Sequence, residues 1–85
     1  MSMRGSGVRT RVQVPKLGET SDVVVVENWL IEVGEPVTAG SPIVSVQTDK
    51  VVVDVVSPAD GVLVEVLVQV DDEARTGDDL CVIEQ

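Results

Sequence analysis

Short valine-rich stretches, separated by glycine and proline, make up most of the chain. Valine is densest at 23–26, 51–53 and 55–56. Its branched β-carbon suits the extended backbone of a strand better than a helix, and no apolar stretch keeps a convincing helical period. The pattern therefore predicts an all-β domain without helices. The predicted strands lie near 11–14, 23–31, 43–47, 51–56, 61–69 and 80–84, with shorter pieces near 36–38 and 73–75.

The clearest periodicity is a strict alternation between residues 62 and 70. Valine occupies every second position, and leucine, glutamate and glutamine stand between. Successive side chains of a strand point to opposite faces. This alternation predicts a strand with one buried face that the valines at 62, 64, 66, 68 and 70 form.

A faint internal repeat relates two parts of the chain. Residues 33–40 align with residues 70–77 at an offset of 37 residues, which also separates Gly40 from Gly77. Two similar halves, 14–50 and 51–85, predict a pseudo-twofold axis. Such an axis carries the junction at Lys50 onto the place where the chain ends meet. The turn around Lys50 is therefore expected at the end of the domain opposite the termini.

Composition narrows the functional classes. The 85 residues suffice for one domain, and they carry 15 acidic against 6 basic side chains, a net charge of -9. This excess of negative charge argues against binding to nucleic acid or to an anionic membrane surface, and it favours a soluble monomer. The chain has no histidine, which removes the commonest general base and metal ligand. No apolar run has the length of a membrane span.

Two local features concern the ends of the chain. Residues 1–11 hold three arginines among serine and glycine, and we interpret them as a flexible arm or a remnant of an expression vector, with the folded domain at 12–85. Cys81 is the only cysteine, so the chain forms no internal disulfide. Its apolar neighbours indicate a small buried hydrophobic residue.

The junction between the halves carries the one candidate for chemistry. Thr48 and Asp49 favour a turn, because their side chains bond to nearby backbone groups. Lys50 follows at the tip, between strands of nearly pure valine. A lysine on an exposed hairpin is usually just solvated, so the residue type alone leaves its role open.

Four blocks in order give a resemblance to a known family. Residues 48–51 (Thr-Asp-Lys-Val) resemble the lipoylation motif of lipoyl domains, which belong to the acyltransferase components of 2-oxo acid dehydrogenase complexes. Residues 14–19 resemble the opening block of that family, residues 29–37 its second-strand block and residues 57–61 its turn after the modified lysine. The resemblance spans about residues 12–84. Gln47 departs from it, since many relatives carry Glu there.

The resemblance implies a flattened barrel, or sandwich, of two four-stranded sheets with pseudo-twofold symmetry (a barrel-sandwich hybrid). It implies lipoate linked as an amide to Lys50, with Thr48, Asp49 and Val51 recognised by the lipoylating enzyme. The polar loop after the first strand would lie near the lysine and help the dehydrogenase recognise the domain. That loop consists of Gly18, Glu19, Thr20, Ser21 and Asp22.

The implied function is that of a non-catalytic carrier with a swinging arm. The lipoyl group would shuttle acyl groups and reducing equivalents between a thiamin diphosphate-dependent 2-oxo acid dehydrogenase, an acyltransferase domain and dihydrolipoyl dehydrogenase. A lipoate ligase or lipoyl transferase would load it. The expected location is the bacterial cytoplasm or, as an alternative, the mitochondrial matrix. Which 2-oxo acid is used, and whether the chain is part of a larger acyltransferase, stay open.

Other interpretations remain. A biotinyl carrier domain of a carboxylase or decarboxylase resembles this fold, but that family typically has Met on both sides of its lysine, where this chain has Asp49 and Val51. The glycine-cleavage carrier protein is longer. An enzyme lacks support, because no paired nucleophile and base, phosphate loop or metal-ligand spacing is evident. An inert β-module would leave Lys50 unmodified. The acidic residues Glu19, Asp22, Asp49 and Asp54 either steer a basic partner or form an ordinary solvated face.

Overall fold

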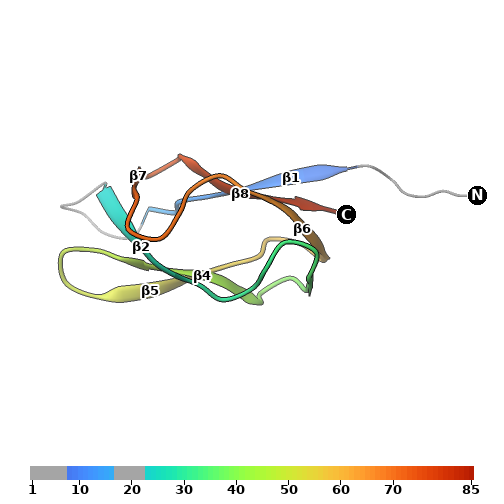
Figure 1. Cartoon of the computed structure of the whole chain (residues 1–85), viewed down its shortest axis with the longest axis horizontal. Helices are drawn as coiled ribbons and strands as arrows, with labels where there is room; N and C mark the ends of the chain where they lie inside the picture. The colour runs from blue at the N-terminus through green and yellow to red at the C-terminus, as the bar shows by residue number, and fades with distance from the viewer. Residues whose placement is uncertain (1–7, 17–22) are drawn as a thin grey trace, which may run out of the picture.

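Eight strands make up the fold in the part of the chain that the structure describes. A computed structural model describes residues 8–16 and 23–85, and within these ranges the chain contains no helix, as the valine-rich pattern predicts (Figure 1). The strands are β1 (Arg9–Gln13), β2 (Val23–Trp29), β3 (Pro36–Val37), β4 (Pro42–Gln47), β5 (Val52–Val56), β6 (Gly61–Val66), β7 (Glu73–Arg75) and β8 (Asp79–Glu84).

Each predicted strand is present, with shifted ends. β2 ends at Trp29 and β6 at Val66, both earlier than predicted. β1 begins at Arg9, so residues 9–11, which the sequence analysis assigned to the arm, belong to the fold. These residues are ordered because they pair with β8: Arg9 lies opposite Glu84 and Arg11 opposite Val82. The polar composition of residues 1–11 gives no sign of this pairing.

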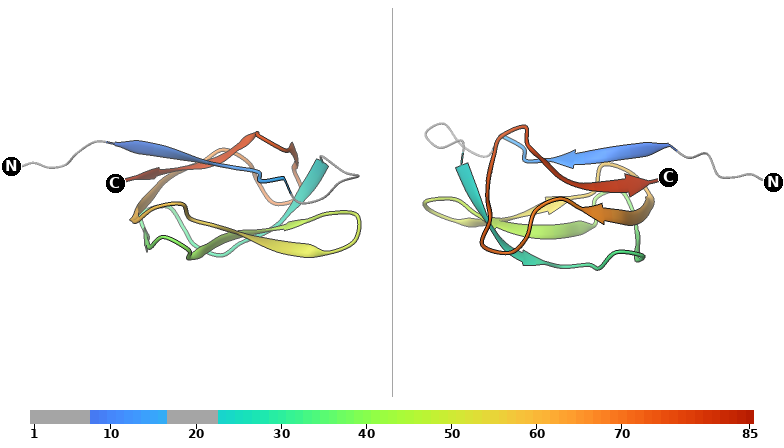
Figure 2. Two further views of the ribbon diagram at one scale, coloured as in Figure 1. Left: turned by 180° about the vertical axis from the view of Figure 1, so that it is seen from behind. Right: turned by 45° about the horizontal axis from the view of Figure 1, so that its top comes forward.

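The strands form two antiparallel four-stranded sheets, and each sheet combines both halves of the chain. One sheet has the order β1-β8-β6-β3 and the other β5-β4-β2-β7. In each sheet two central strands from one half are flanked by outer strands from the other half. Figures 1 and 2 show the two sheets facing each other as a flattened sandwich. This confirms the expected architecture.

The sheet order also has the symmetry that the repeat predicted. Exchanging β1 with β5, β2 with β6, β3 with β7 and β4 with β8 converts one sheet order into the other. Backbone geometry follows the same offset of 37 residues. Gly34 and Asp71 have φ values of 98° and 76°, and Gly40 and Gly77 have 89° and 91°. The left-handed backbone at Asp71 is uncommon for a residue other than glycine, and its symmetry mate is a glycine.

Turn hydrogen bonds repeat in the same way. The Leu30 N–H donates to the Ile43 carbonyl at 2.8 Å, and the Leu67 N–H donates to the Leu80 carbonyl at 2.9 Å. At the ends of the molecule, the bond from Thr48 N–H to the Val51 carbonyl (2.8 Å) corresponds to the bond from Gln85 N–H to the Val8 carbonyl (2.8 Å). The pseudo-twofold thus relates the β4–β5 turn to the paired chain ends.

The core between the sheets is aliphatic and obeys the repeat. Ile43, Val44 and Val46 of β4 are fully buried, as are Leu80, Cys81 and Ile83 at the equivalent positions of β8. Cys81 therefore occupies the place that a valine takes in the other half, which confirms its interpretation as a small buried hydrophobic residue. Trp29, the only aromatic residue, packs against this core and donates its indole N–H to the Val68 carbonyl at 3.1 Å.

The prediction that the five valines of residues 62–70 form one buried face is wrong at Val62 and Val70 and is borne out only in part, at Val66 and Val68. Leu63 is fully buried, whereas Val62 is 38% and Val70 46% exposed. The β6–β8 register shifts between Leu63 and Glu65, and such a bulge changes which residues face the core. Beyond it, Val66 and Val68 pack against the core as partly buried residues. An alternation read from sequence does not show where a bulge interrupts it.

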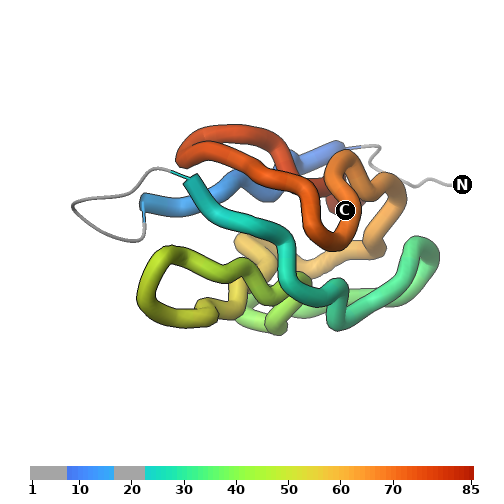
Figure 3. Tube along the Cα trace, turned by 60° about the vertical axis from the view of Figure 1, so that its left-hand side comes forward, coloured from blue at the N-terminus to red at the C-terminus, as the bar shows by residue number. Residues whose placement is uncertain are grey.

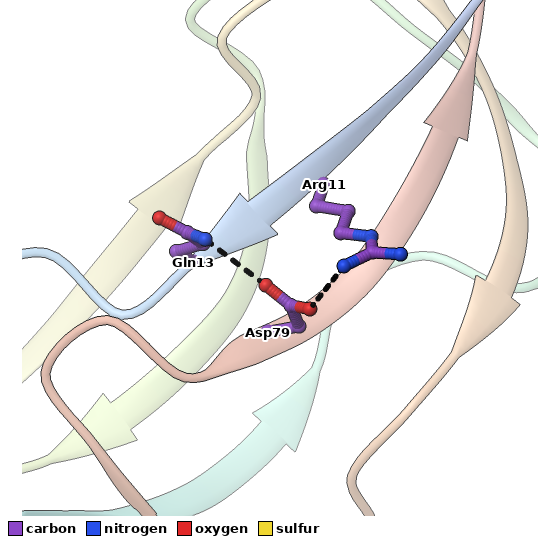
Figure 4. Close-up of polar contacts among 3 residues, drawn as sticks. All are labelled: Arg11, Gln13 and Asp79. Carbon is purple, nitrogen blue, oxygen red and sulfur yellow. Dashed lines mark hydrogen bonds and ion pairs between the residues drawn. The ribbon is translucent and has the colours of Figure 1, made fainter.

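Polar contacts hold the outer strand β1 on β8. Arg9 forms an ion pair with Glu84 at 3.3 Å and Arg11 with Asp79 at 3.2 Å. Asp79 also accepts a hydrogen bond from the Gln13 amide at 3.1 Å, so one carboxylate joins two side chains of β1 (Figure 4). These groups are largely solvent-exposed, and pairs of this kind contribute little to stability. They neutralise two cations that would otherwise form a basic arm.

The bulge predicts a contrast between neighbours. Replacing Leu63 with Ala should lower the free energy of unfolding by about 2–5 kcal/mol, because it leaves a cavity in the core. Replacing the exposed Val62 with Ala should change it by less than about 1 kcal/mol. Urea unfolding monitored by Trp29 fluorescence measures both. The reverse ranking would restore the valine face and contradict the bulge.

Burial of Cys81 predicts a pH dependence of stability. Burial raises the pKa of the Cys81 thiol from 9.0 to about 11. The folded state therefore holds this proton more tightly than the unfolded chain does. The resulting stability is fully present below pH 9 and is lost as the pH rises through about 11. Cys81→Val, which copies Val44 of the other half, should weaken the decline in urea midpoint over this range; an identical decline in both proteins would contradict the assignment.

Candidate attachment site

The candidate site is the hairpin that joins β4 to β5. The two strands pair up to Gln47 and Val52, with Val46 opposite Val53 behind them. Four residues, 48–51, close the hairpin. It projects from the end of the sandwich that faces the viewer at the lower left of Figure 3, and it lies opposite the C-terminus and the start of β1 (Figure 1). The position that the repeat predicted for Lys50 is therefore confirmed.

Thr48 organises this turn with its side chain. Its hydroxyl accepts hydrogen bonds from the N–H groups of Lys50 (3.2 Å) and Val51 (3.1 Å). The same hydroxyl donates to the Val51 carbonyl at 3.0 Å. The Thr48 N–H donates to that carbonyl as well, at 2.8 Å. The backbone of the lysine is thus fixed from within the turn.

The side chains at the tip are presented to solvent. Asp49, Lys50 and Val51 are exposed, and Val52 at the start of β5 is 52% exposed. Within residues 8–16 and 23–85, neither the Asp49 carboxylate nor the Lys50 amine has a hydrogen-bonded or ionic partner. The lysine amine is therefore accessible to an enzyme that would acylate it, while the backbone beneath it is held.

The surroundings of the tip contain some of the acidic residues expected there. Asp54 lies on the outer face of β5 and accepts a hydrogen bond from the Ser45 hydroxyl at 2.7 Å, so it is engaged across β4 and β5. The predicted recognition residues Gly18, Glu19, Thr20, Ser21 and Asp22 lie outside the described residues. The strand that follows them, β2, begins at the same end of the molecule as the hairpin (Figure 1).

The described part of the chain contains no group of side chains suited to hold a metal ion. No helix capable of crossing a membrane occurs in it. A cavity of about 280 Å³ opens between β1 and β5. Its eight lining residues form four pairs related by the pseudo-twofold: Arg11 and Asp54, Val12 and Val55, Gln13 and Val56, Pro15 and Pro58. The cavity is the seam where two sheet edges meet.

Comparison with known proteins decides the family. The biotin–lipoyl family model, described as that of a biotin-requiring enzyme, matches residues 10–83. The solution structure of the lipoyl domain of the Azotobacter vinelandii 2-oxoglutarate dehydrogenase complex superimposes with a TM-score of 0.71 at 31% identity. The alignment covers 88% of this chain and 95% of that domain. The chain belongs to the biotin–lipoyl family, as one of its lipoyl domains.

Curated relatives agree with the lipoyl branch of the family. The chain is 38% identical over 72 residues to the dihydrolipoyllysine-residue acetyltransferase component of the pyruvate dehydrogenase complex of Corynebacterium glutamicum. It is 40% identical over 72 residues to the succinyltransferase component of the 2-oxoglutarate dehydrogenase complex of Staphylococcus saprophyticus. Both matches cover 85% of this chain but only 11% and 17% of those proteins. The lipoyl domain is a carrier and is not itself catalytic.

The sequence located the lysine, and the structure adds what holds it. The tendency of Thr48 to bond nearby backbone groups is confirmed, whereas Asp49 makes no such bond in the described structure. The Ser45–Asp54 bond was not foreseen. Only the pairing register of β4 and β5, which places these two residues opposite each other, could have indicated this bond.

Proposed function

We propose that the lipoyl domain carries lipoate in amide linkage to Lys50. The observation that supports this most directly is an exposed lysine amine that has no hydrogen-bonded or ionic partner among the described residues, on a turn that the Thr48 hydroxyl holds. This turn lies at the end of the lipoyl fold opposite the C-terminus and the start of β1 (Figure 1). An amide bond needs a free amine and room for a chain beyond it, and Lys50 provides both. When bound, the lipoyl group supplies a dithiolane that accepts an acyl group and is reduced in the process.

The residues of the domain hold Lys50 in position, and the lipoyl group would supply the chemistry. The hydrogen bonds of Thr48 hold the backbone of Lys50, and β4 and β5 anchor that turn to the core through paired backbone and buried valines. Lys50 needs no proton-transfer role once acylated. Because the amide carbonyl removes its positive charge, the loaded tip retains the exposed carboxylate of Asp49. This leaves a net acidic end for a basic partner to meet.

The partners we propose follow from this carrier role. They are a thiamin diphosphate-dependent 2-oxo acid dehydrogenase that loads the dithiolane, an acyltransferase domain that unloads it, and dihydrolipoyl dehydrogenase that reoxidises it. A lipoate ligase or lipoyl transferase would modify Lys50. A tether joined before β1 or after β8 leaves the lysine end free, because the start of β1 and the C-terminus lie at the end of the domain opposite the β4–β5 hairpin (Figure 1). The curated relatives cited above are bacterial, and we propose the bacterial cytoplasm as the site of action.

Biotin is the alternative group, since the matching family includes biotin carriers. Asp49 and Val51 flank the lysine here, in place of the Met residues typical of biotinyl domains. Lipoate is therefore the proposal, and biotin is an outcome that the experiment distinguishes.

The test uses the two lysines of the chain, Lys16 and Lys50. Incubation with a lipoate ligase, ATP and lipoate should add one lipoyl group, which intact mass and a peptide map place on Lys50. Lys50→Ala should abolish the modification without unfolding the domain, because the exposed lysine amine makes no hydrogen bond or ion pair with the described residues. Lys16→Ala, the matched control, should be modified like the parent.

Three results would contradict the proposal. They are modification that survives Lys50→Ala, an unmodified parent under conditions that lipoylate a known lipoyl domain, and transfer of biotin by a biotin ligase in preference to lipoate. Melting of each variant, followed by Trp29 fluorescence, shows whether a loss of modification reflects a loss of fold.

A further inference from the structure

We propose that Thr48 is a positioning residue for modification of Lys50, acting through the turn backbone, whereas Asp49 is the side chain presented to the modifying enzyme. This inference rests on the proposed function and assigns the two motif residues different tasks. The sequence resemblance alone treated both as part of one recognised motif.

The bonding capacity of the hydroxyl supports this role. A threonine hydroxyl has one proton and two lone pairs. At Thr48 the proton goes to the Val51 carbonyl, and the lone pairs take the N–H groups of Lys50 and Val51. All three bonds lie inside the turn. The hydroxyl therefore has no remaining capacity for a strong bond to another protein.

Comparison of the two ends of the domain isolates what Thr48 adds. The backbone bond from Thr48 N–H to the Val51 carbonyl has its symmetry mate in the bond from Gln85 N–H to the Val8 carbonyl, also at 2.8 Å. That bond is therefore a general feature of this strand pairing. At the lysine end the Thr48 hydroxyl makes three bonds within the turn, and one of them reaches the N–H of Lys50 itself. At the other end the symmetry mate of Thr48 is Gln85, whose side chain accepts a hydrogen bond from the Thr10 hydroxyl at 3.1 Å.

Asp49 provides the contrast. It is exposed and has no hydrogen-bonded partner in the described part of the chain. Its carboxylate is free to meet a complementary group on another protein, and changing it should leave the turn backbone unaltered. Thr48 and Asp49 are adjacent in one motif but have different tasks. Amide hydrogen exchange and the kinetics of lipoylation measure the two tasks separately.

The experiment compares Thr48→Val, Thr48→Ser and Asp49→Asn with the parent. Valine has the shape of threonine without the hydroxyl, and serine keeps the hydroxyl. Amide hydrogen exchange at Lys50 and Val51 should accelerate at least about fivefold in Thr48→Val, because both N–H groups lose their acceptor. The kcat/KM of a lipoate ligase for this variant should fall by about tenfold or more. Thr48→Ser should restore both quantities to near the parent values.

Asp49→Asn should leave exchange at these amides unchanged while it lowers kcat/KM. The positioning role is overturned if Thr48→Val is lipoylated at the parent rate. It is also overturned if Thr48→Ser keeps slow exchange but remains a poor substrate, since the enzyme would then contact the threonine methyl group. A parent that no ligase lipoylates refutes the proposed function instead, and unchanged exchange in Thr48→Val would still refute the bonds that carry this inference.

Discussion

The fold depends on the exchange of strands between the two halves of the chain. β3 leaves the first half to pair with β6, and β7 leaves the second half to pair with β2. β1 and β5 likewise each flank a strand of the opposite half, so neither half completes a sheet alone. In a domain of 85 residues, which buries a modest share of its surface, this interleaving joins both halves into one aliphatic core. It also fixes the relation between the chain ends and the lysine turn.

The function proposed for the domain uses that relation. The pseudo-twofold produces two equivalent ends, one closed by residues 48–51 and the other formed by the paired Val8 and Gln85. Strand ladders hold both ends, and at the closed end the Thr48 hydroxyl makes three bonds within the turn. A carrier requires a point of attachment that is exposed in its side chain and ordered in its backbone. The hairpin meets both requirements because its order comes from groups beneath the lysine rather than from the lysine itself.

Much of this could be predicted from the sequence, for physical reasons. Valine-rich runs and glycine punctuation indicated the strands, and the repeat of residues 33–40 at 70–77 predicted the symmetry and the position of Lys50. Which side chains of β6 face the core could not be predicted, because the bulge between Leu63 and Glu65 depends on the partner strand β8. The start of β1 at Arg9 likewise depends on Glu84, which lies 75 residues away. The positioning role of Thr48 could not be predicted either, because a tendency to form turns does not specify which hydrogen bonds the hydroxyl makes.

The proposed carrier role requires a lysine turn that is rigid in its backbone and mobile in its side chain. Backbone ¹⁵N relaxation of the lipoylated domain, combined with ¹³C relaxation of a labelled Lys50 side chain, measures both parts at once. We expect order parameters of about 0.85 for the amides of residues 49–51, as in rigid backbone, and values well below this for the lysine methylenes. Amide values below about 0.6 across the turn, or side-chain values that match the backbone, would contradict it.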